Sequence, residues 1–191
     1  MHTIFKLVPL TAAIALAACG GGGDKAADAA CGQLEANQIC VKIGSGAPKT
    51  GGIAHLGKDN ENGAQLAVNE INAAGGVKIG DKVAKFALVG EDDAGDPKQG
   101  PVVAQKLVDA KVVGVVGHLN SGVSIPANAV YAKAGLVQIS PSSTNPDYTI
   151  KGNKTPKGSV SSYRVVATDA QQGPALGKYM LGKNAKTVAV L

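Results

Sequence analysis

Six short apolar runs, rich in β-branched residues, alternate along this chain with segments in which apolar residues recur every three or four positions. The runs are the expected strands and span residues 41–47, 83–90, 112–116, 136–139, 160–166 and 187–191. A short apolar run bounded by turn residues is typical of a buried strand, and the longer periodicity is typical of an amphipathic helix. The alternation predicts an α/β fold with a doubly wound, mostly parallel sheet.

Several helix boundaries are also visible. Gly75 and Gly76 end the helical period between the first two strands. Asp96 followed by Pro97 is typical of an N-cap and a first helical position. In the next helix, Pro126 is compatible only with a place near the first turn. The residues expected to face the core are Ala64, Ala67, Val68, Ile71 and Ala74, then Val103, Leu107 and Ala110, then Val123, Ala127, Val130, Tyr131 and Ala134.

The first thirty residues indicate export rather than fold. The charged start MHTIFK precedes an apolar stretch over residues 7–18 and then Cys19, the layout of a secretory signal that is too short to span a membrane. The sequence from Leu16 to Cys19 resembles the bacterial lipobox, which implies cleavage before Cys19, lipidation of Cys19 and a flexible tether over residues 20–30. An ordinary signal peptide with an incidental cysteine is the alternative.

Two cysteines remain if Cys19 is lipidated. Cys31 and Cys40 are separated by eight residues, and an even pair in an oxidising compartment predicts a disulfide. Free thiols or a metal pair are the alternative. No histidine lies near, and the spacing is not that of a zinc knuckle.

The positive charge does not indicate nucleic-acid binding. Of 19 basic residues only Arg164 is an arginine, the lysines are scattered, and aromatic residues make up 3% of the chain. Base readout favours arginine, and single-strand binding needs interleaved aromatic residues. We therefore expect a solvated lysine surface and no nucleic-acid partner.

Three catalytic or cofactor motifs are incomplete. The loop at residues 44–50 resembles a phosphate loop, but Pro48 stands where a glycine N–H is required. Ser121 lacks the glycine two positions earlier that a nucleophile elbow needs, so a hydrolase using Ser121 and His118 is disfavoured. The acidic turn of Asp92, Asp93 and Asp96 favours helix capping over calcium binding. We expect no cofactor, no bound metal and no catalysis.

Two polar turns follow neighbouring predicted strands, at residues 117–122 and 140–146. The carboxyl ends of parallel strands share one edge of the sheet, where open α/β proteins place ligands. The Ser121 hydroxyl, a helix N-terminus and the N–H of Ser143 or Thr144 could receive a carboxylate. A carbonyl near Ser142 and the Thr144 hydroxyl could hold an ammonium group. Alternatively, these residues only cap helices and shape turns.

At this point the chain resembles the Leu/Ile/Val-binding family of type 1 periplasmic binding proteins, the substrate-binding proteins of branched-chain amino acid ABC transporters. Each matching segment is weak alone, but their order and spacing are specific. The matching segments are Ile53 to Gly57, Gly63 to Val68 with Ile71 to Ala73, Asp92 to Ala94 with Asp96 to Gln99, Gly117 to Leu119 with Ser121, Pro141 with Thr144 and Pro146, and Asp169 with Gln171 to Pro174.

The resemblance implies two α/β lobes that close on an amino acid, a branched-chain or another aliphatic one, held mainly by the first lobe. Carried over by position, one ligand turn is Leu119, Asn120 and Ser121, and the other is Ser142, Ser143 and Thr144. Leu56 stands where the family often has an aromatic residue lining the side-chain pocket. Some members carry a disulfide between the acidic turn and the ligand turn, where this chain has Gly95 and Asn120.

These features predict how the chain is organised. We expect a lipoprotein signal at 1–18, the tether with its disulfide at 19–40, the ligand-binding lobe at 41–167, and the incomplete start of a second lobe at 168–191. Thr168 and Gln171 have the spacing of a capping box for a helix that reaches Leu181. Because the last predicted strand stops abruptly, we expect the chain to be the front portion of a longer protein.

The expected function is that of a monomeric, lipid-anchored periplasmic protein that delivers an amino acid to an ABC permease. A protein of the same fold that binds or senses an amide, urea or another small metabolite is the alternative. The resemblance implies that acidic and aromatic ligand contacts come from the second lobe. An acidic residue there, facing the ammonium group, would favour amino acids.

Overall fold

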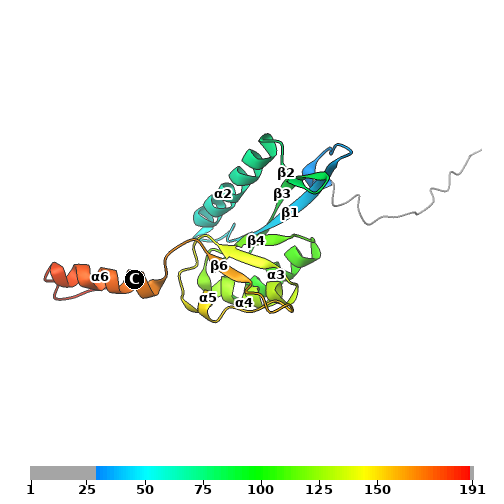
Figure 1. Ribbon diagram of the computed structural model, residues 1–191. Coiled ribbons are helices and arrows are strands. Elements are labelled where there is room, and N and C mark those ends of the chain that lie inside the picture. Colours follow the sequence, from blue (N-terminus) through cyan, green and yellow to red (C-terminus); the bar gives the residue numbers. More distant parts are fainter. Residues whose placement is uncertain (1–28, 190–191) are drawn as a thin grey trace, which may run out of the picture.

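The computed structural model describes residues 29–189, and six of its strands form one sheet in the order β2-β3-β1-β4-β5-β6 (Figure 1). The strands are β1 (Gln38–Ala47), β2 (Val77–Ile79), β3 (Lys82–Asp92), β4 (Gly114–Gly117), β5 (Val137–Ser140) and β6 (Ser162–Arg164). Every neighbouring pair is parallel except β2 and β3. The predicted α/β class and mostly parallel sheet are therefore confirmed.

The register brings the functional turns to one edge. β1 is the central strand, and its last residue, Ala47, pairs with Asp92 at the end of β3, while Gly46 pairs with Gly117 at the end of β4. On the other side of β4, Ser140 ends β5 opposite Arg164 in β6. The acidic turn and both polar turns thus leave the same carboxyl edge of the sheet.

Helices lie on both sides of the sheet. α3 (Gln99–Asp109) and α4 (Ser121–Lys133) pack beside each other on one side, and α2 (Ala54–Ala73) packs against β1 and β3 on the other (Figure 1). A three-residue 3-10 helix (Ala29–Cys31) precedes β1, and the one-turn helix α5 (Asp147–Ile150) precedes β6. α6 (Asp169–Gly182) extends away from the sheet and has no buried residue.

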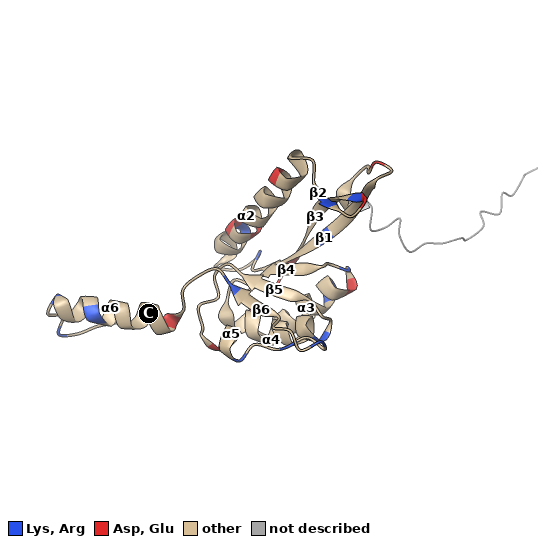
Figure 2. Cartoon of the chain, viewed as in Figure 1, with Lys and Arg blue, Asp and Glu red and all other residues tan. Residues whose placement is uncertain are grey.

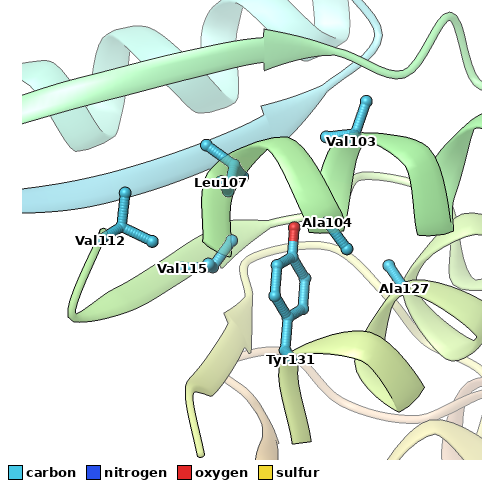
Figure 3. Close-up of a cluster of buried hydrophobic side chains, with 7 residues drawn as sticks. All are labelled: Val103, Ala104, Leu107, Val112, Val115, Ala127 and Tyr131. Atoms are coloured by element: carbon cyan, nitrogen blue, oxygen red, sulfur yellow. The ribbon is translucent and has the colours of Figure 1, made fainter. Parts of the chain in front are cut away.

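The main core lies between the sheet and the α3–α4 pair. Tyr131 of α4 is fully buried there, next to Leu107 of α3 and Val115 of β4 (Figure 3). This confirms the inward face predicted for α3 and most of that predicted for α4, although Ala134 is exposed. Burial of large apolar side chains of this kind stabilises a fold by about 1.5–3 kcal/mol each.

Part of the opposite sheet face is not covered by any helix of the described residues. Val137 and Ile139 of β5 are 37% and 42% exposed, and Val113, just before β4, is 59% exposed. They border a shallow, apolar hollow of about 230 Å³. In α2, Val68 is buried but Ala67 and Ile71 are exposed, because α2 packs only on β1 and β3.

Several strand predictions differ from the structure. β6 is shorter than the predicted strand 160–166, and residues 187–189 of the predicted strand 187–191 form no strand. Strands require hydrogen bonds from a neighbour, and α6 carries the following residues away from the sheet. β1 begins at Gln38, three residues early. The antiparallel strand β2 was missed because three residues are too few to show a period.

The helix starts differ in detail. α3 begins at Gln99 rather than at Pro97, yet Asp96 Oδ1 accepts the Lys98 N–H at 2.9 Å and so still acts as a cap. Pro126 lies in the second turn of α4, not the first. The hydrogen bond that proline removes would end at the carbonyl of Gly122, which is exposed and accessible to water. Thr168 is the N-cap of α6 as predicted, but it makes no side-chain capping bond.

The disulfide between Cys31 and Cys40 is present and ties the residues before β1 to that strand. The predicted signal peptide and the lipidated Cys19 lie outside the described residues. No helix within residues 29–189 is long and apolar enough to cross a membrane. Charged side chains are spread over many elements (Figure 2).

Candidate functional site

The two polar turns meet at the carboxyl edge of the sheet. The first, residues 118–120, joins β4 to α4, and the second, residues 141–146, joins β5 to α5. The Ser142 hydroxyl donates to the carbonyl of Leu119 at 3.0 Å, and the Asn145 N–H donates to Ser121 Oγ at 3.1 Å. Turns that are about twenty residues apart in sequence are therefore held together by direct hydrogen bonds.

The first turn presents donors that the fold leaves unused. Ser121 is the first residue of α4, and its oxygen accepts from Asn145, so its hydroxyl proton is available. The carbonyl of Asn120 accepts the N–H groups of Val123 and Ser124. Among the described residues, no acceptor is found for the N–H groups of Ser121 and Gly122. A helix N-terminus with free N–H groups favours an anion.

Ser143 of the second turn is buried and is used inside the fold. Its hydroxyl lies 2.7 Å from Ser124 Oγ, and its N–H donates to Ser140 Oγ at 2.9 Å. Since that N–H is engaged, Ser143 is not a free donor toward a carboxylate. Its contribution is to the shape of the turn.

Thr144 differs from Ser143. It is only partly buried, and within residues 29–189 neither its hydroxyl nor its N–H has a hydrogen-bond partner. Its carbonyl accepts the Asp169 N–H at 3.0 Å, which links the turn to the start of α6. Thr144 is therefore a residue of the second turn with free donors.

α2 contributes a wall to the same site. Asn60 Nδ2 donates to Ser142 Oγ at 3.2 Å, so this helix touches the second turn. Leu56 lies four residues earlier, on the same face of the helix, and is 46% exposed. Leu56 therefore shares the face of α2 that meets the second turn.

Arg164 supports the second turn from β6. Its guanidinium donates to the carbonyl of Ser143 at 2.8 Å, to the carbonyl of Pro146 at 3.2 Å and to Thr149 Oγ1 at 2.7 Å. It also lies 5.5 Å from the ring centroid of Tyr148. Only a planar group with several donors can satisfy these acceptors together, which explains an arginine here in a chain otherwise rich in lysine.

His118 is fully buried, and both of its ring nitrogens are engaged. Nδ1 lies 2.6 Å from Asp93 Oδ2, and Nε2 lies 3.0 Å from the Tyr131 hydroxyl. The ring is therefore unable to take a proton from Ser121, and a Ser121–His118 hydrolase is ruled out. Both ring nitrogens are used inside the fold, so His118 has a structural role.

The acidic turn is held by hydrogen bonds that its carboxylates accept. Asp92 accepts hydrogen bonds from the Lys49 N–H at 2.7 Å, from the Ala94 N–H at 2.8 Å and from the Thr50 hydroxyl at 2.7 Å. Burial alone would raise the pKa of Asp92, but these hydrogen bonds together outweigh it and hold the pKa below its ordinary value. No metal-binding cluster is found within the described residues.

Gly95 and Asn120 face each other across the acidic turn and the first ligand turn. A Cβ placed on Gly95 would lie 3.6 Å from Asn120 Oδ1, a buried oxygen that has no hydrogen-bond partner in the described part of the chain. The oxygen of the Asn120 side chain therefore points toward the acidic turn.

The site is an open surface that offers hydrogen-bond donors and one apolar side chain. The larger hollows lie elsewhere: one of about 410 Å³ between α3 and α4, and another of about 390 Å³ beside Gly135 and Thr155. Neither touches the two turns. The arrangement can hold an anionic group, and it presents no activated nucleophile.

Sequence reasoning missed three residues of this arrangement. Asn60 gave no signal, because an asparagine inside a helix has many roles. Arg164 was noticed only as the one arginine, and a unique arginine next to a strand end could have suggested a clamp. Asp93 was grouped with its acidic neighbours, although it alone pairs with His118.

Comparisons with known proteins agree with this architecture. Residues 40–191 match the model of the periplasmic binding protein family. The Leu/Ile/Val-binding protein homolog 1 of Brucella melitensis is 40% identical over 190 residues, which cover 98% of this chain and 44% of that protein. An amino acid binding protein of Pseudomonas aeruginosa is 42% identical, with coverage of 79% and 38%. The chain therefore spans less than half the length of these relatives.

Solved structures of substrate-binding proteins are also similar to this chain. The branched-chain amino acid transporter substrate-binding protein LivJ of Streptococcus pneumoniae, in complex with isoleucine, is 35% identical with a TM-score of 0.64, over 74% of this chain and 38% of that one. A solute-binding protein of an ABC transporter from Rhodopseudomonas palustris, in complex with 3,4-dihydroxybenzoic acid, is 26% identical with a TM-score of 0.60, over 76% and 37%.

Proposed function

The chain belongs to the periplasmic binding protein family, and we propose that it is the front part of a substrate-binding protein that captures an amino acid and delivers it to an ABC permease. The observation that carries this proposal is the cluster of unused donors on two adjoining turns. The Ser121 hydroxyl and the N–H groups of Ser121 and Gly122 face the same edge as Thr144. They suit a carboxylate, and nothing beside them suits a reaction.

Each predicted site residue has a role in the proposal. Ser121 and Thr144 donate to the ligand carboxylate, and Leu119 and Asn120 contribute backbone groups. Ser142 and Ser143 keep the turns together through their hydrogen bonds to the Leu119 carbonyl and to Ser124. Leu56 lines the place of the ligand side chain and favours an aliphatic one.

The ligand class is proposed from the carboxylate. Isoleucine and 3,4-dihydroxybenzoic acid, found in the two related structures, share a carboxylate and differ in everything else. First-lobe donors of the kind seen here would serve both. The amino acid is favoured because of the 40% identical Leu/Ile/Val-binding homologue, and an amide, urea or another small metabolite remains the second candidate.

The remaining expectations concern the setting of the protein. We propose a lipid on Cys19, a location in the periplasm and a monomeric state, with a ligand-binding lobe over residues 41–167 and a second lobe that starts at residue 168. Labelling with a radioactive fatty acid tests the lipid. The label is expected in the wild type and not in Cys19→Ala.

Isothermal titration calorimetry of the full-length mature protein tests the function. Leucine, isoleucine and valine are compared with 3,4-dihydroxybenzoate, acetamide and urea. We expect saturable binding of at least one aliphatic amino acid. Binding of urea or acetamide alone would support the second candidate, and binding of none of these ligands would refute the proposal.

A further inference from the structure

We propose that His118 is a positioning residue for both ligand turns, and that Asp93 and Tyr131 hold it as a neutral imidazole with its proton on Nδ1. The inference rests on the proposed function, because positioning of the turns matters only if they bind a ligand. In this proposal, the hydrogen bond between Asp93 and His118 is a noncovalent link between the acidic turn and the first ligand turn.

The ring of His118 connects three elements. Asp93 follows β3, His118 follows β4, and Tyr131 belongs to α4. The rings of His118 and Tyr131 are stacked with centroids 6.0 Å apart, and all three side chains are fully buried. With no exposure to solvent, the arrangement has no route for a substrate, and its role is therefore structural support rather than chemistry.

Hydrogen-bond accounting selects the tautomer. Asp93 Oδ1 already accepts the Gly95 N–H at 2.8 Å, which leaves Oδ2 as the acceptor for His118 Nδ1–H. Burial, together with the Asp93 carboxylate, raises the pKa of Tyr131, so the phenol keeps its proton. Among the described residues, that proton has no acceptor other than His118 Nε2. A charged imidazolium would donate from Nε2 and would leave the buried phenol proton without an acceptor.

The carbonyl of His118 collects hydroxyl groups from both sides of the site. Three hydroxyl oxygens lie within hydrogen-bond distance of it: Ser140 Oγ at 2.7 Å, Ser124 Oγ at 3.2 Å and Ser143 Oγ at 3.3 Å. Ser140 Oγ in turn accepts the N–H groups of Ser142 and Ser143. A displacement of His118 therefore moves the second turn as well as the first.

The central strand leaves room for the ring. A Cβ on Gly46 would lie only 2.5 Å from Cε1 of His118, closer than real contacts allow. Gly46 belongs to the loop that resembled a phosphate motif in the sequence. A glycine is needed at this position because the His118 ring occupies the space where a side chain would lie. β1 therefore packs against the same group of buried residues.

Nitrogen NMR of the full-length mature protein tests the first half of the proposal. His55 is the only other histidine after residue 18, so His55→Gln assigns the His118 signals. The expected pattern is a protonated Nδ1 and an unprotonated Nε2, with Nε2 shifted in Tyr131→Phe. A protonated Nε2 in the wild type, whether in the other tautomer or in imidazolium, would overturn the proposal.

Affinity tests the second half. Tyr131→Phe removes only the phenol oxygen and is expected to weaken amino acid binding about tenfold. The matched control is Tyr148→Phe, which also removes a buried hydroxyl, one that donates to the Gln138 carbonyl at 3.2 Å. Tyr148→Phe is expected to change the unfolding midpoint by a similar amount. It is expected to leave the His118 nitrogen shifts unchanged and to change the affinity less than twofold.

Equal affinity of Tyr131→Phe and the wild type, with both folded, would refute a positioning role. If Tyr131→Phe fails to fold, Asp93→Asn replaces it with nearly the same shape. That variant is expected to lose at least tenfold in affinity, and unchanged affinity would refute the proposal. A wild type that binds no ligand refutes the proposed function instead, and the tautomer measurement still stands.

Discussion

At the scale of single residues, the most informative side chain is Ser121, whose oxygen is engaged by the fold and whose proton is not. The Asn145 N–H fixes the position of the oxygen, so the proton can be directed at a ligand without cost in ordering the side chain. We expect Ser121→Ala to weaken amino acid binding by about 1–3 kcal/mol, the worth of a charge-assisted hydrogen bond. Calorimetry of the full-length mature protein measures the change.

The control for this change is Ser159→Ala. Ser159 is exposed in the loop before β6, and its side chain makes no hydrogen bond in the described structure. Its substitution is expected to leave the affinity unchanged. If Ser121→Ala binds as tightly as this control, Ser121 is not a ligand residue.

Asp92 predicts a dependence of stability on pH. Its pKa in the folded protein lies below the ordinary value of 3.8, so the unfolded state binds the proton more readily. The stabilisation is fully present above about pH 4, near the unfolded pKa, and is lost as the pH falls through the lower folded pKa. Asp92→Asn should therefore lower the free energy of unfolding by about 1 kcal/mol at pH 7.

Urea unfolding at pH 7 and at pH 3 measures this difference. The difference in the free energy of unfolding between the wild type and Asp92→Asn is expected to be smaller at pH 3, where the wild type has lost part of the stabilisation from the Asp92 charge. A gap that stays constant between the two pH values would mean that the Asp92 charge contributes nothing.

At the scale of elements, the contact between β6 and the second turn depends on Arg164. Lysine would keep the charge but would not reach the Ser143 carbonyl, the Pro146 carbonyl and the Thr149 hydroxyl together. We expect Arg164→Lys to destabilise the fold by about 1–3 kcal/mol, because partly buried acceptors are left unpaired, and to weaken ligand binding. Urea unfolding and calorimetry measure the two effects.

Lys151→Met provides the contrast. It breaks the ion pair between Lys151 and Asp147, in which the lysine side chain is 73% exposed. Exposed ion pairs contribute little, so the change is expected to stay within about 0.5 kcal/mol. A destabilisation equal to that of Arg164→Lys would show that the guanidinium geometry does not matter.

Elements were predicted well where they are long and buried, and poorly where they are short. The central strand β1 and the helices α3 and α4 each bury a face, so their periods are visible in the sequence. β2 and α5 have three and four residues and are held by neighbours rather than by their own pattern. The position of Pro126 was predicted wrongly: the proline lies in the second turn of α4, where the carbonyl that loses its partner belongs to the exposed Gly122.

At the scale of the whole molecule, the uncovered sheet face has consequences for any shortened form. Residues 29–191 produced alone would expose Val113, Val137 and Ile139 to water. Parallel sheets are normally covered on both faces. We expect this segment to bind a hydrophobic dye and to self-associate in sedimentation, and the double variant Val137→Thr/Ile139→Thr to do both less.

The control is a pair of substitutions on exposed apolar residues far from this face, Leu176→Thr and Leu181→Thr in α6. If they reduce association as much as the changes in β5, the sheet face is not the cause.

The same segment is expected to bind an amino acid weakly, because an open surface neither surrounds the ligand nor excludes water.

The sequence by itself determined the α/β class, the mostly parallel sheet, the disulfide and the two polar turns, because each depends on local residue patterns or on a pair of cysteines. Only the tertiary structure decided which polar groups of those turns are free. Ser143 and Thr144 are adjacent and chemically alike. Ser143 is buried and its hydroxyl and N–H are hydrogen-bonded, whereas Thr144 is only partly buried and its donors are free. Likewise, Asp93, His118 and Tyr131 come together only when two strand ends and a helix are packed. Hydrogen bonds between distant segments leave no period in the sequence, so the fold must be seen to identify them.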